Sequence, residues 1–377
     1  MVVFAFILSS TFRYLWTVNT HPAKIITLLL DLAMSYTAEW TSILSSDCDI
    51  VISPTEELSL QTDLITFLAT AQRFQIPILP TTWETGRSEA GLGGTSIIHG
   101  SDVDLVTLFA YKRVHETSKR TTTENQLFGL LVREITISGH NFIRQNPHIT
   151  QLQGICWDIS ADDKPWPVLI FERSDLRDLY SYYDRKPSWQ ETDLPARIRY
   201  CVEIGTAIIA MHSICTVHGD IKPENVLLFM QKDKPNITKV IDFGYSLQFT
   251  PRSRKMKLPI SRPWNAPEHT RGMREWTFEQ AVKTEVFSYG MLCLWMLFYD
   301  YFYKLCPGKG SRYGISTVKE SLRPLSRLLL ADEPSLTSDQ RQSLGNFFDA
   351  SLQEDPQQRE SSIVRLLQNL DPQWYVR

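Results

Sequence analysis

The most informative stretch of this sequence is Val217-His218-Gly219-Asp220-Ile221-Lys222-Pro223-Glu224-Asn225. It places a carboxylate at Asp220, an ammonium group at Lys222 and an amide at Asn225 in one short polar turn, and a second carboxylate, Asp242, comes 22 residues after the first. Phosphoryl transfer from ATP needs such groups: a carboxylate to orient the attacking hydroxyl, a second carboxylate with an amide oxygen to hold magnesium, and a lysine to neutralise charge. The spacing therefore predicts Asp220, Lys222 and Asn225 as catalytic residues, with Asn225 and Asp242 as magnesium ligands.

Asp242 lies in Ile241-Asp242-Phe243-Gly244, after a short apolar run that is typical of a strand. The order His-x-Asp-x-Lys-Pro-x-Asn, followed at this distance by Asp-Phe-Gly, is highly specific. On these motifs the chain resembles the eukaryotic protein kinases, most closely their Ser/Thr branch, from about Trp83 to about Leu370. The resemblance implies an α+β, bilobal fold with a small β-rich N-lobe and a larger helical C-lobe. It also implies ATP and Mg as cofactors.

The resemblance further implies a set of ATP-binding residues. Glycines in the stretch 91–98 let backbone N–H groups approach phosphate oxygens, although Ser96 stands where the third glycine of the G-x-G-x-x-G pattern is expected. Lys112 would pair with the α- and β-phosphates, Glu134 would hold that lysine, and the stretch 171–174 would form the adenine-binding hinge, its first residue narrowing the pocket. The implied set is Gly91, Gly93, Gly94, Ser96, Ile98, Lys112, Glu134, Phe171, Glu172 and Ser174.

The C-terminal half carries further marks of the family. Asn265-Ala266-Pro267-Glu268 resembles the end of an activation segment, and the resemblance implies that Glu268 pairs with a buried arginine, for which Arg359 is the candidate. The apolar stretch Val286–Phe298 resembles the central helix of the large lobe. Both marks are structural rather than catalytic.

Three positions depart from the family pattern. Gly219 stands where an arginine normally follows the catalytic-loop histidine, so a phosphate on the activation segment loses its usual partner. Glu285 stands where the central helix normally opens with an aspartate, and its side chain is one methylene longer. Ser138 occupies a position usually filled by a bulky apolar side chain, unless the alignment slips by one residue to Ile137. None of the three removes a catalytic group.

Three functions compete on this pattern. The leading one is a Ser/Thr kinase acting on protein substrates, because Lys222, two residues after the base, and Ser261, five residues before Ala266, suit the Ser/Thr branch. The alternative is a pseudokinase that acts as an ATP-binding or scaffolding module, and convergence of the catalytic groups on one cleft discriminates the two. A small-molecule kinase of related fold is less favoured, because such kinases generally lack the Ala-Pro-Glu segment.

Composition narrows the class of partner. The chain has 39 basic and 42 acidic residues among 377, a net charge of −3, so no basic excess favours a nucleic acid. The six cysteines form no C-x-x-C pair, which favours reduced thiols in a cytoplasmic or nuclear protein. The apolar run Val2–Leu8 is far shorter than the roughly 20 residues of a membrane span, so no membrane partner is expected.

Three regions are expected along the chain. Residues 1–80 contain no glycine and few charges and are predicted to be a helical N-terminal extension, with a helix over Ser59–Arg73. Residues 81–174 are predicted to form the N-lobe and residues 175–372 the C-lobe. Apolar patterns predict strands at 104–111 and 166–171, and helices at 127–143, 197–213, 286–298, 340–352 and 363–370.

Overall fold

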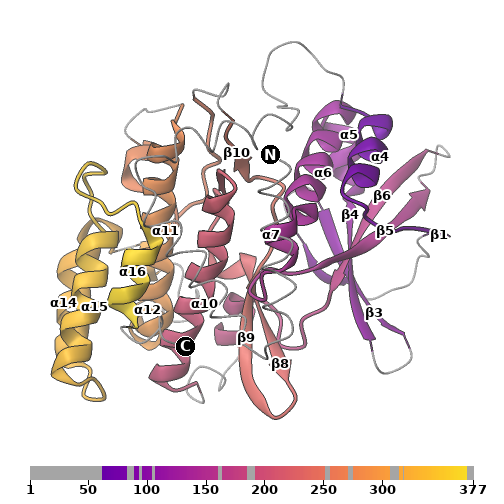
Figure 1. Ribbon diagram of the computed structural model, residues 1–377. Helices are drawn as coiled ribbons and strands as arrows, with labels where there is room; N and C mark the ends of the chain where they lie inside the picture. The colour runs from indigo at the N-terminus through magenta and orange to yellow at the C-terminus, as the bar shows by residue number, and fades with distance from the viewer. Residues whose placement is uncertain are drawn as a thin grey trace, which may run out of the picture. The chain divides into compact units, whose positions relative to one another are not determined.

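A computed structural model describes residues 62–82, 89–92, 96–103, 107–159, 164–184, 192–250, 255–270, 275–305, 314–316 and 318–371, with the backbone alone over 80–108. Strands concentrate in the first part of this range and helices in the second, so the predicted α+β fold of two lobes is confirmed (Figure 1). Most of the predicted N-terminal extension, residues 1–61, lies outside the described residues.

A six-stranded sheet forms the framework of the small lobe, in the order β1-β5-β6-β4-β3-β2. Only β1, at one edge, runs parallel to its neighbour β5, and the other neighbours are antiparallel. The predicted strands at 104–111 and 166–171 correspond to β4 and β6, which pair with Lys112 opposite Leu169. The strands are β1 Ile78–Thr82, β2 Glu89–Leu92, β3 Ser96–Val103, β4 Thr107–Val114, β5 Leu152–Ile159 and β6 Pro165–Glu172.

Four helices accompany this sheet in the described part of the lobe. They are α4 Leu64–Arg73, α5 Glu116–Thr121, α6 Glu124–Gly139 and α7 Asn141–Arg144. α6 begins three residues before its apolar pattern, because Thr123 and Gln126 form a capping box that satisfies free N–H groups of the first turn. His140 leaves the helical conformation, with ψ 134°, and its side chain caps α7. The predicted helix 127–143 is therefore two helices.

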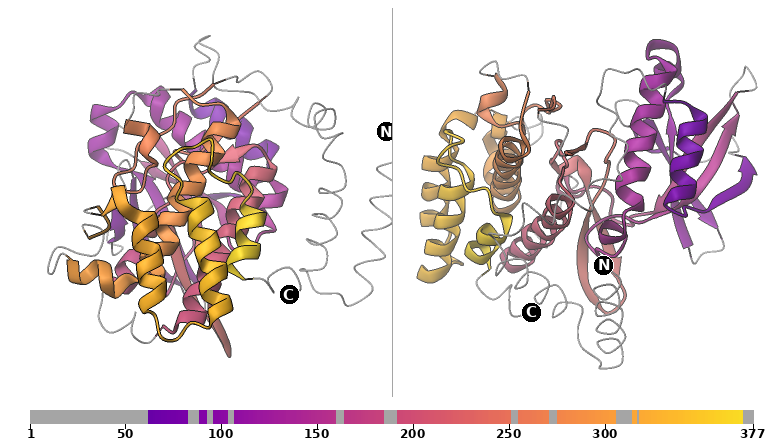
Figure 2. Two further views of the ribbon diagram at one scale, coloured as in Figure 1. Left: turned by 90° about the vertical axis from the view of Figure 1, so that its left-hand side faces the viewer. Right: turned by 45° about the horizontal axis from the view of Figure 1, so that its top comes forward.

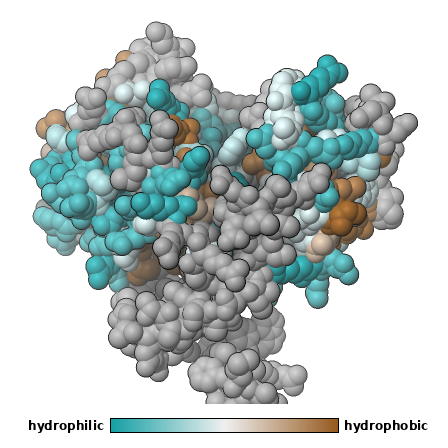
Figure 3. Space-filling model, turned by 90° about the horizontal axis from the view of Figure 1, so that it is seen from above, coloured by the Kyte–Doolittle hydropathy of each residue, from teal (hydrophilic) through white to brown (hydrophobic). Residues whose placement is uncertain are grey.

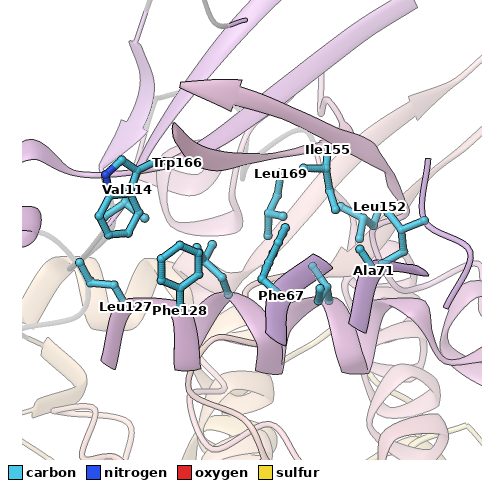
Figure 4. Packing of buried hydrophobic residues seen from close by; sticks show 12 residues of the cluster. Phe67, Ala71, Val114, Leu127, Phe128, Leu152, Ile155, Trp166 and Leu169 are labelled. Carbon is cyan, nitrogen blue, oxygen red and sulfur yellow. The ribbon is translucent and has the colours of Figure 1, made fainter. Parts of the chain in front are cut away.

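One hydrophobic core joins α4 and α6 to the sheet (Figure 4). Phe67 of α4 meets Phe128 of α6 edge to face, with ring centroids 6.4 Å apart, and Phe128 stacks on Trp166 of β6 at 5.1 Å. Ile155 and Leu169 complete the sheet side of this core. Hence α4 and β1, which precede residue 83, pack into the small lobe rather than lying apart from it.

The large lobe is mainly helical, and Figure 2 shows its helices gathered around one another. Two short two-stranded antiparallel sheets, β8 with β9 and β7 with β10, lie between this helical part and the small lobe (Figure 1). The described elements of the large lobe are α8 Leu179–Asp184, α10 Leu194–Ser213, β7 Thr216–Val217, η2 Pro223–Asn225, β8 Val226–Gln231, β9 Lys234–Val240, β10 Leu247–Gln248, η3 Pro267–Thr270, α11 Phe278–Leu297, α12 Tyr299–Leu305, η4 Lys319–Ser321, α14 Leu322–Asp332, α15 Ser338–Ser351 and α16 Ile363–Leu370.

Helix α11 forms the centre of this lobe. From Ala281 to Leu297 every residue is buried except Lys283 and Ser288. The face of the molecule seen in Figure 3 is mostly hydrophilic over the described residues. The helix starts eight residues before the predicted 286–298 range, because Thr277 begins it with a capping box. No single helix in the described ranges is long and apolar enough to cross a membrane; α11 and α12 pass that test only as a pair bent by 87°.

Candidate active site

One lysine joins three elements at the boundary of the lobes. Lys112, on β4, places its Nζ 2.7 Å from both carboxylate oxygens of Glu134 on α6. The same Nζ lies 2.8 Å from Oδ1 of Asp242, which follows β9 in the large lobe. The three side chains line one cavity between β4 and α6. The structure thus brings together three groups from a stretch of the sequence in which the first and the last lie 130 residues apart.

The charges of Lys112 and Asp242 hold each other in the ionised form. Burial alone would lower the pKa of Lys112, but the carboxylates of Asp242 and Glu134 outweigh it and raise that pKa above its ordinary value. Burial would likewise raise the pKa of Asp242, but Lys112 holds it below its ordinary value. Burial dominates at Glu134, whose pKa is raised despite Lys112. Asp242 is therefore a carboxylate at neutral pH, as a magnesium ligand must be.

The catalytic loop forms a second cluster around Asp220. Its Oδ2 accepts hydrogen bonds from Lys222 Nζ at 2.7 Å and from Asn225 Nδ2 at 2.8 Å. Its Oδ1 is buried and has no hydrogen-bond partner among the described residues. A buried carboxylate oxygen normally has a hydrogen-bond partner, so the lack of one at Oδ1 calls for an explanation. One explanation is that Oδ1 is the oxygen that can accept a proton from a bound hydroxyl. The arrangement is that of a fixed general base with one working oxygen.

Backbone bonds tie the two clusters into one site. His218 Nε2 donates to Ile241 O at 2.9 Å, and Ile241 N–H donates to Asn225 O at 3.0 Å. Because a carbonyl only accepts, His218 carries its proton on Nε2, and its Nδ1 accepts the Asp220 N–H at 3.2 Å. These bonds hold Asp242 in a left-handed conformation, φ +69°, which a non-glycine residue adopts only when its surroundings enforce it.

The chain that carries this site also matches a known protein family. The chain matches the family model described as "Protein kinase domain" over residues 89–374. The chain belongs to the protein kinase family. A kinase domain implies ATP as the phosphoryl donor, and the two clusters occupy the positions that this chemistry requires.

Three relatives illustrate the match. The chain is 32% identical to an SNF-related serine/threonine-protein kinase of Homo sapiens over 124 residues, 33% of this chain and 15% of that protein. It is 33% identical to the serine/threonine-protein kinase pakC of Dictyostelium discoideum over 181 residues, 47% of this chain and 34% of that protein. It is 29% identical to the inactive tyrosine-protein kinase kin-32 of Caenorhabditis elegans over 177 residues, 45% of this chain and 17% of that protein. The matches thus span at most 34% of the length of these relatives.

Glu285 fits the kinase catalytic loop in spite of its extra methylene. Its Oε1 accepts the Gly219 N–H at 2.8 Å, and its Oε2 accepts a hydrogen bond from His212 Nε2 at 2.7 Å. Gly219 has φ +75°, a conformation that glycine adopts without strain. A Cβ at that position would also lie 3.2 Å from Pro259. The glycine therefore suits this loop locally, and the longer carboxylate still anchors it to α11.

Ser138 lies four residues after Glu134 on α6, the position where a bulky apolar side chain is usual in the family. Because Glu134 reaches Lys112, the register of α6 is fixed, and the one-residue slip to Ile137 does not occur. Ser138 is 2% exposed, and its Oγ has no hydrogen-bond partner in the part of the chain that the structure describes. A buried hydroxyl without a partner packs less favourably than an apolar side chain.

The first group of predicted nucleotide-binding residues belongs to the glycine-rich stretch 91–98. Gly91 and Ile98 pair across the β2–β3 hairpin and Ser96 begins β3, while Gly93 and Gly94 lie outside the described residues. These positions agree with a glycine-rich hairpin that covers a nucleotide.

The hinge residues use their side chains for other purposes. Glu172 accepts two bonds from Lys239 Nζ, each 2.7 Å, and its N–H donates to Gln151 O at 3.3 Å, so that amide is not available to adenine. Ser174 Oγ donates to Leu228 O and ties the hinge to β8. Phe171 packs against the small-lobe core. Any contact of this stretch with adenine therefore falls to its other backbone groups.

The family pairing of Glu268 with Arg359 is present in the structure. The guanidinium binds both carboxylate oxygens, at 2.6 and 3.0 Å, and the side chain of Arg359 is fully buried. Arg359 also donates to Lys283 O at 2.9 Å and to Gln353 O at 2.8 Å. This pair fixes the end of the activation segment to the base of α11.

Arg133 is a functional residue that sequence reasoning missed. It precedes Glu134 on α6, and its Nη1 donates to Gly244 O at 3.2 Å. Burial lowers the pKa of this guanidinium, which nonetheless stays charged at neutral pH. α6 therefore holds both Lys112 and the Asp-Phe-Gly segment. No spacing rule signals this bond, because it joins residues 111 positions apart.

Proposed function

We propose that the chain is an active Ser/Thr protein kinase that transfers the γ-phosphate of Mg-ATP to hydroxyl groups of protein substrates. The observation that carries the proposal is the contact of one ammonium group, Lys112 Nζ, with both Glu134 and Asp242 at 2.7–2.8 Å. Phosphoryl transfer requires this lysine–glutamate pair and the metal-binding aspartate to be in place together. All six predicted groups have the chemistry that their roles need.

The donor set fits magnesium. Asn225 uses Nδ2 to bind Asp220, and no hydrogen bond among the described residues occupies its Oδ1. Asp242 contributes a charged carboxylate, and magnesium prefers such oxygen ligands. When bound, magnesium would neutralise charge that develops on the phosphates.

The catalytic loop supplies the proton acceptor. Asp220 would orient the substrate hydroxyl and accept its proton on Oδ1, while Lys222 and Asn225 fix the carboxylate through Oδ2. Ser261 lines the same small cavity as Asp220, which supports the Ser/Thr reading of the activation segment. The hydroxyl acceptor of a serine or threonine is short, so the base must be held close and rigid.

The second candidate is a pseudokinase that binds nucleotide as a scaffold. It is favoured by the departures at Gly219 and Ser138 and by a relative whose name describes an inactive kinase. Neither departure removes a group that contacts the reacting atoms. The geometry therefore favours the active enzyme over the scaffold.

Phosphorylation of a generic protein substrate tests the proposal. Asp220→Asn should lower turnover by about 100- to 10,000-fold, the usual contribution of a general base, and should leave Mg-ATP binding nearly intact. Asp339→Asn, an exposed carboxylate on α15, is the matched control and should keep the wild-type rate. Phosphoamino-acid analysis should give phosphoserine and phosphothreonine. Phosphotyrosine alone, or a fully active Asp220→Asn variant, would reject the assignment.

A further inference from the structure

Helix α6 contacts the active site through two neighbouring side chains. Glu134 binds Lys112 at 2.7 Å, and Arg133 binds the carbonyl of Gly244 at 3.2 Å. A small shift of α6 along or away from the sheet would break both contacts together. Kinase activity depends on the position of this helix, so the elements that hold α6 on its other sides matter for catalysis.

The preceding helix, α4, packs beside α6, and both contribute side chains to one core (Figures 1 and 4). Near the start of α6, Asn125 Oδ1 accepts the Thr62 N–H at 2.7 Å. In the middle, the buried rings of Phe67 and Phe128 meet edge to face. The two helices therefore contact each other at several points rather than at one.

The end of α6 carries the tightest contact of this pair. Phe74, directly after α4, lies so close to Gly139 that a Cβ added to the glycine would be 2.6 Å from Phe74 Cβ. Arg144, on α7, donates to Phe74 O at 3.4 Å. Only a glycine allows the backbone of α6 to approach Phe74 this closely.

The strand β1 fastens the other end of this segment to the sheet. Ile155 N–H donates to Pro77 O at 2.9 Å, and Ile78 pairs with Ile155 in the parallel ladder of β1 with β5. Only three residues separate Phe74 from Ile78, so the segment has little slack. The helix α4 and the strand β1 thus clamp α6 against the sheet.

Two observations give this clamp a role of its own. The segment precedes residue 89, where the match to the kinase family begins, so it is an addition to the domain. The chain also lacks two features that help to align α6 and the activation segment, a bulky side chain at Ser138 and an arginine at Gly219. A clamp on the opposite side of α6 can supply the missing restraint.

We propose that residues 62–82, comprising α4 and β1, form a built-in positioning element that holds α6 where Glu134 reaches Lys112. The kinase domain then needs no separate partner or activation-segment phosphate to place this helix. The inference deepens the proposed function and rests on it for its activity measurements.

A matched pair of glycines on α6 provides the test. Gly139→Ala forces Phe74 away, because the 2.6 Å contact must open to at least 3.0 Å, whereas Gly129 has nothing within 4 Å of its added Cβ. Gly129→Ala gains helix propensity in the interior of α6, whereas Gly139 is the last residue of the helix, where that gain is smaller. A misplacement of about 1 Å can cost on the order of 100-fold in rate. We expect Gly139→Ala to lower kcat/KM by about 10- to 100-fold relative to Gly129→Ala.

A double-mutant cycle separates positioning from general stability. If the clamp acts through Glu134, then Gly139→Ala should have less than about a twofold effect in a Glu134→Gln background, because the contact it disturbs is already lost. Single-turnover measurements with excess enzyme keep the slow variants measurable. Equal rates for Gly139→Ala and Gly129→Ala, or an undiminished effect in the Glu134→Gln background, would overturn the inference.

Two further arms keep the test decisive. Asn125→Ala removes the exposed bond to Thr62 without touching the core, and the same cycle with Glu134→Gln applies if Gly139→Ala fails to fold. Mg-ATP affinity, measured by calorimetry on the same variants, repeats the cycle without turnover. An inactive wild type would reject the proposed kinase activity, while coupling in the affinity cycle would still support the clamp and additive affinities would reject it.

Discussion

Replacing Glu285 by aspartate introduces the residue that is usual for the kinase family at this position. We nevertheless expect the change to lower both the stability of the protein and its kcat. The carboxylate of Glu285 is 1% exposed and serves two partners, the Gly219 N–H at 2.8 Å and His212 Nε2 at 2.7 Å. Aspartate withdraws the carboxylate by about one C–C bond, roughly 1.5 Å. A contact lengthened beyond about 3.6 Å is no longer a hydrogen bond, so at least one of the two bonds is lost.

The expected size of the effect follows from burial. A buried donor left without a partner costs about 1–3 kcal/mol, and Glu285→Asp should lower the free energy of unfolding by about that amount. Because Gly219 directly precedes Asp220, the loop that carries the base loses its anchor on α11. A misplaced base should lower kcat by about 10- to 100-fold.

Urea unfolding and steady-state phosphorylation measure the two effects separately. Glu285→Gln is the matched control, because it keeps the side-chain length and an oxygen for the Gly219 N–H. We expect the loss of stability and of kcat to be larger for Glu285→Asp than for Glu285→Gln. The opposite order, or wild-type behaviour of Glu285→Asp, would show that length does not decide the fit.

Three further predictions concern burial, pH and metal. Arg359→Met leaves Glu268 as an unpaired buried charge and should cost about 3–5 kcal/mol in urea unfolding, of which adding Glu268→Gln should restore a part. Burial raises the pKa of Glu203 from 4.5 to about 7, so its contribution to stability is present below pH 4.5 and is lost as the pH rises to 7. Glu203→Gln should therefore lose less stability than wild type between pH 5 and pH 8, and an identical pH profile would refute the burial argument. In Asp242→Ala, calorimetry should find ATP affinity insensitive to magnesium, whereas an unchanged dependence would remove this residue from the metal site.

Much of the site can be read from the sequence because its groups are local. Asp220, Lys222 and Asn225 lie within six residues, and the loop geometry that brings them together is short-range. Helix starts at Thr123 and Thr277 are likewise local, because a capping box needs only a threonine and a glutamine three residues later.

Other features depend on contacts that no local pattern encodes. The proline-bracketed segment 77–80 gives no alternation typical of a strand, yet β1 pairs with β5 about 75 residues away because the sheet edge is available. The bond from Arg133 to Gly244 and the use of Glu172 by Lys239 arise only when the lobes come together. Motif spacing therefore identifies the residues of the site, but it does not identify these two contacts between the lobes.

Under the proposed function, the chain turns over Mg-ATP rather than only binding it. Bound nucleotide, measured by calorimetry, and phosphate transferred to a peptide library, measured with labelled ATP, can be compared on one preparation of the wild-type protein. We predict many phosphates transferred to serine and threonine per protein molecule. Tight, magnesium-dependent binding of ATP without transfer to any peptide or to the chain itself would contradict the claim and identify a scaffold.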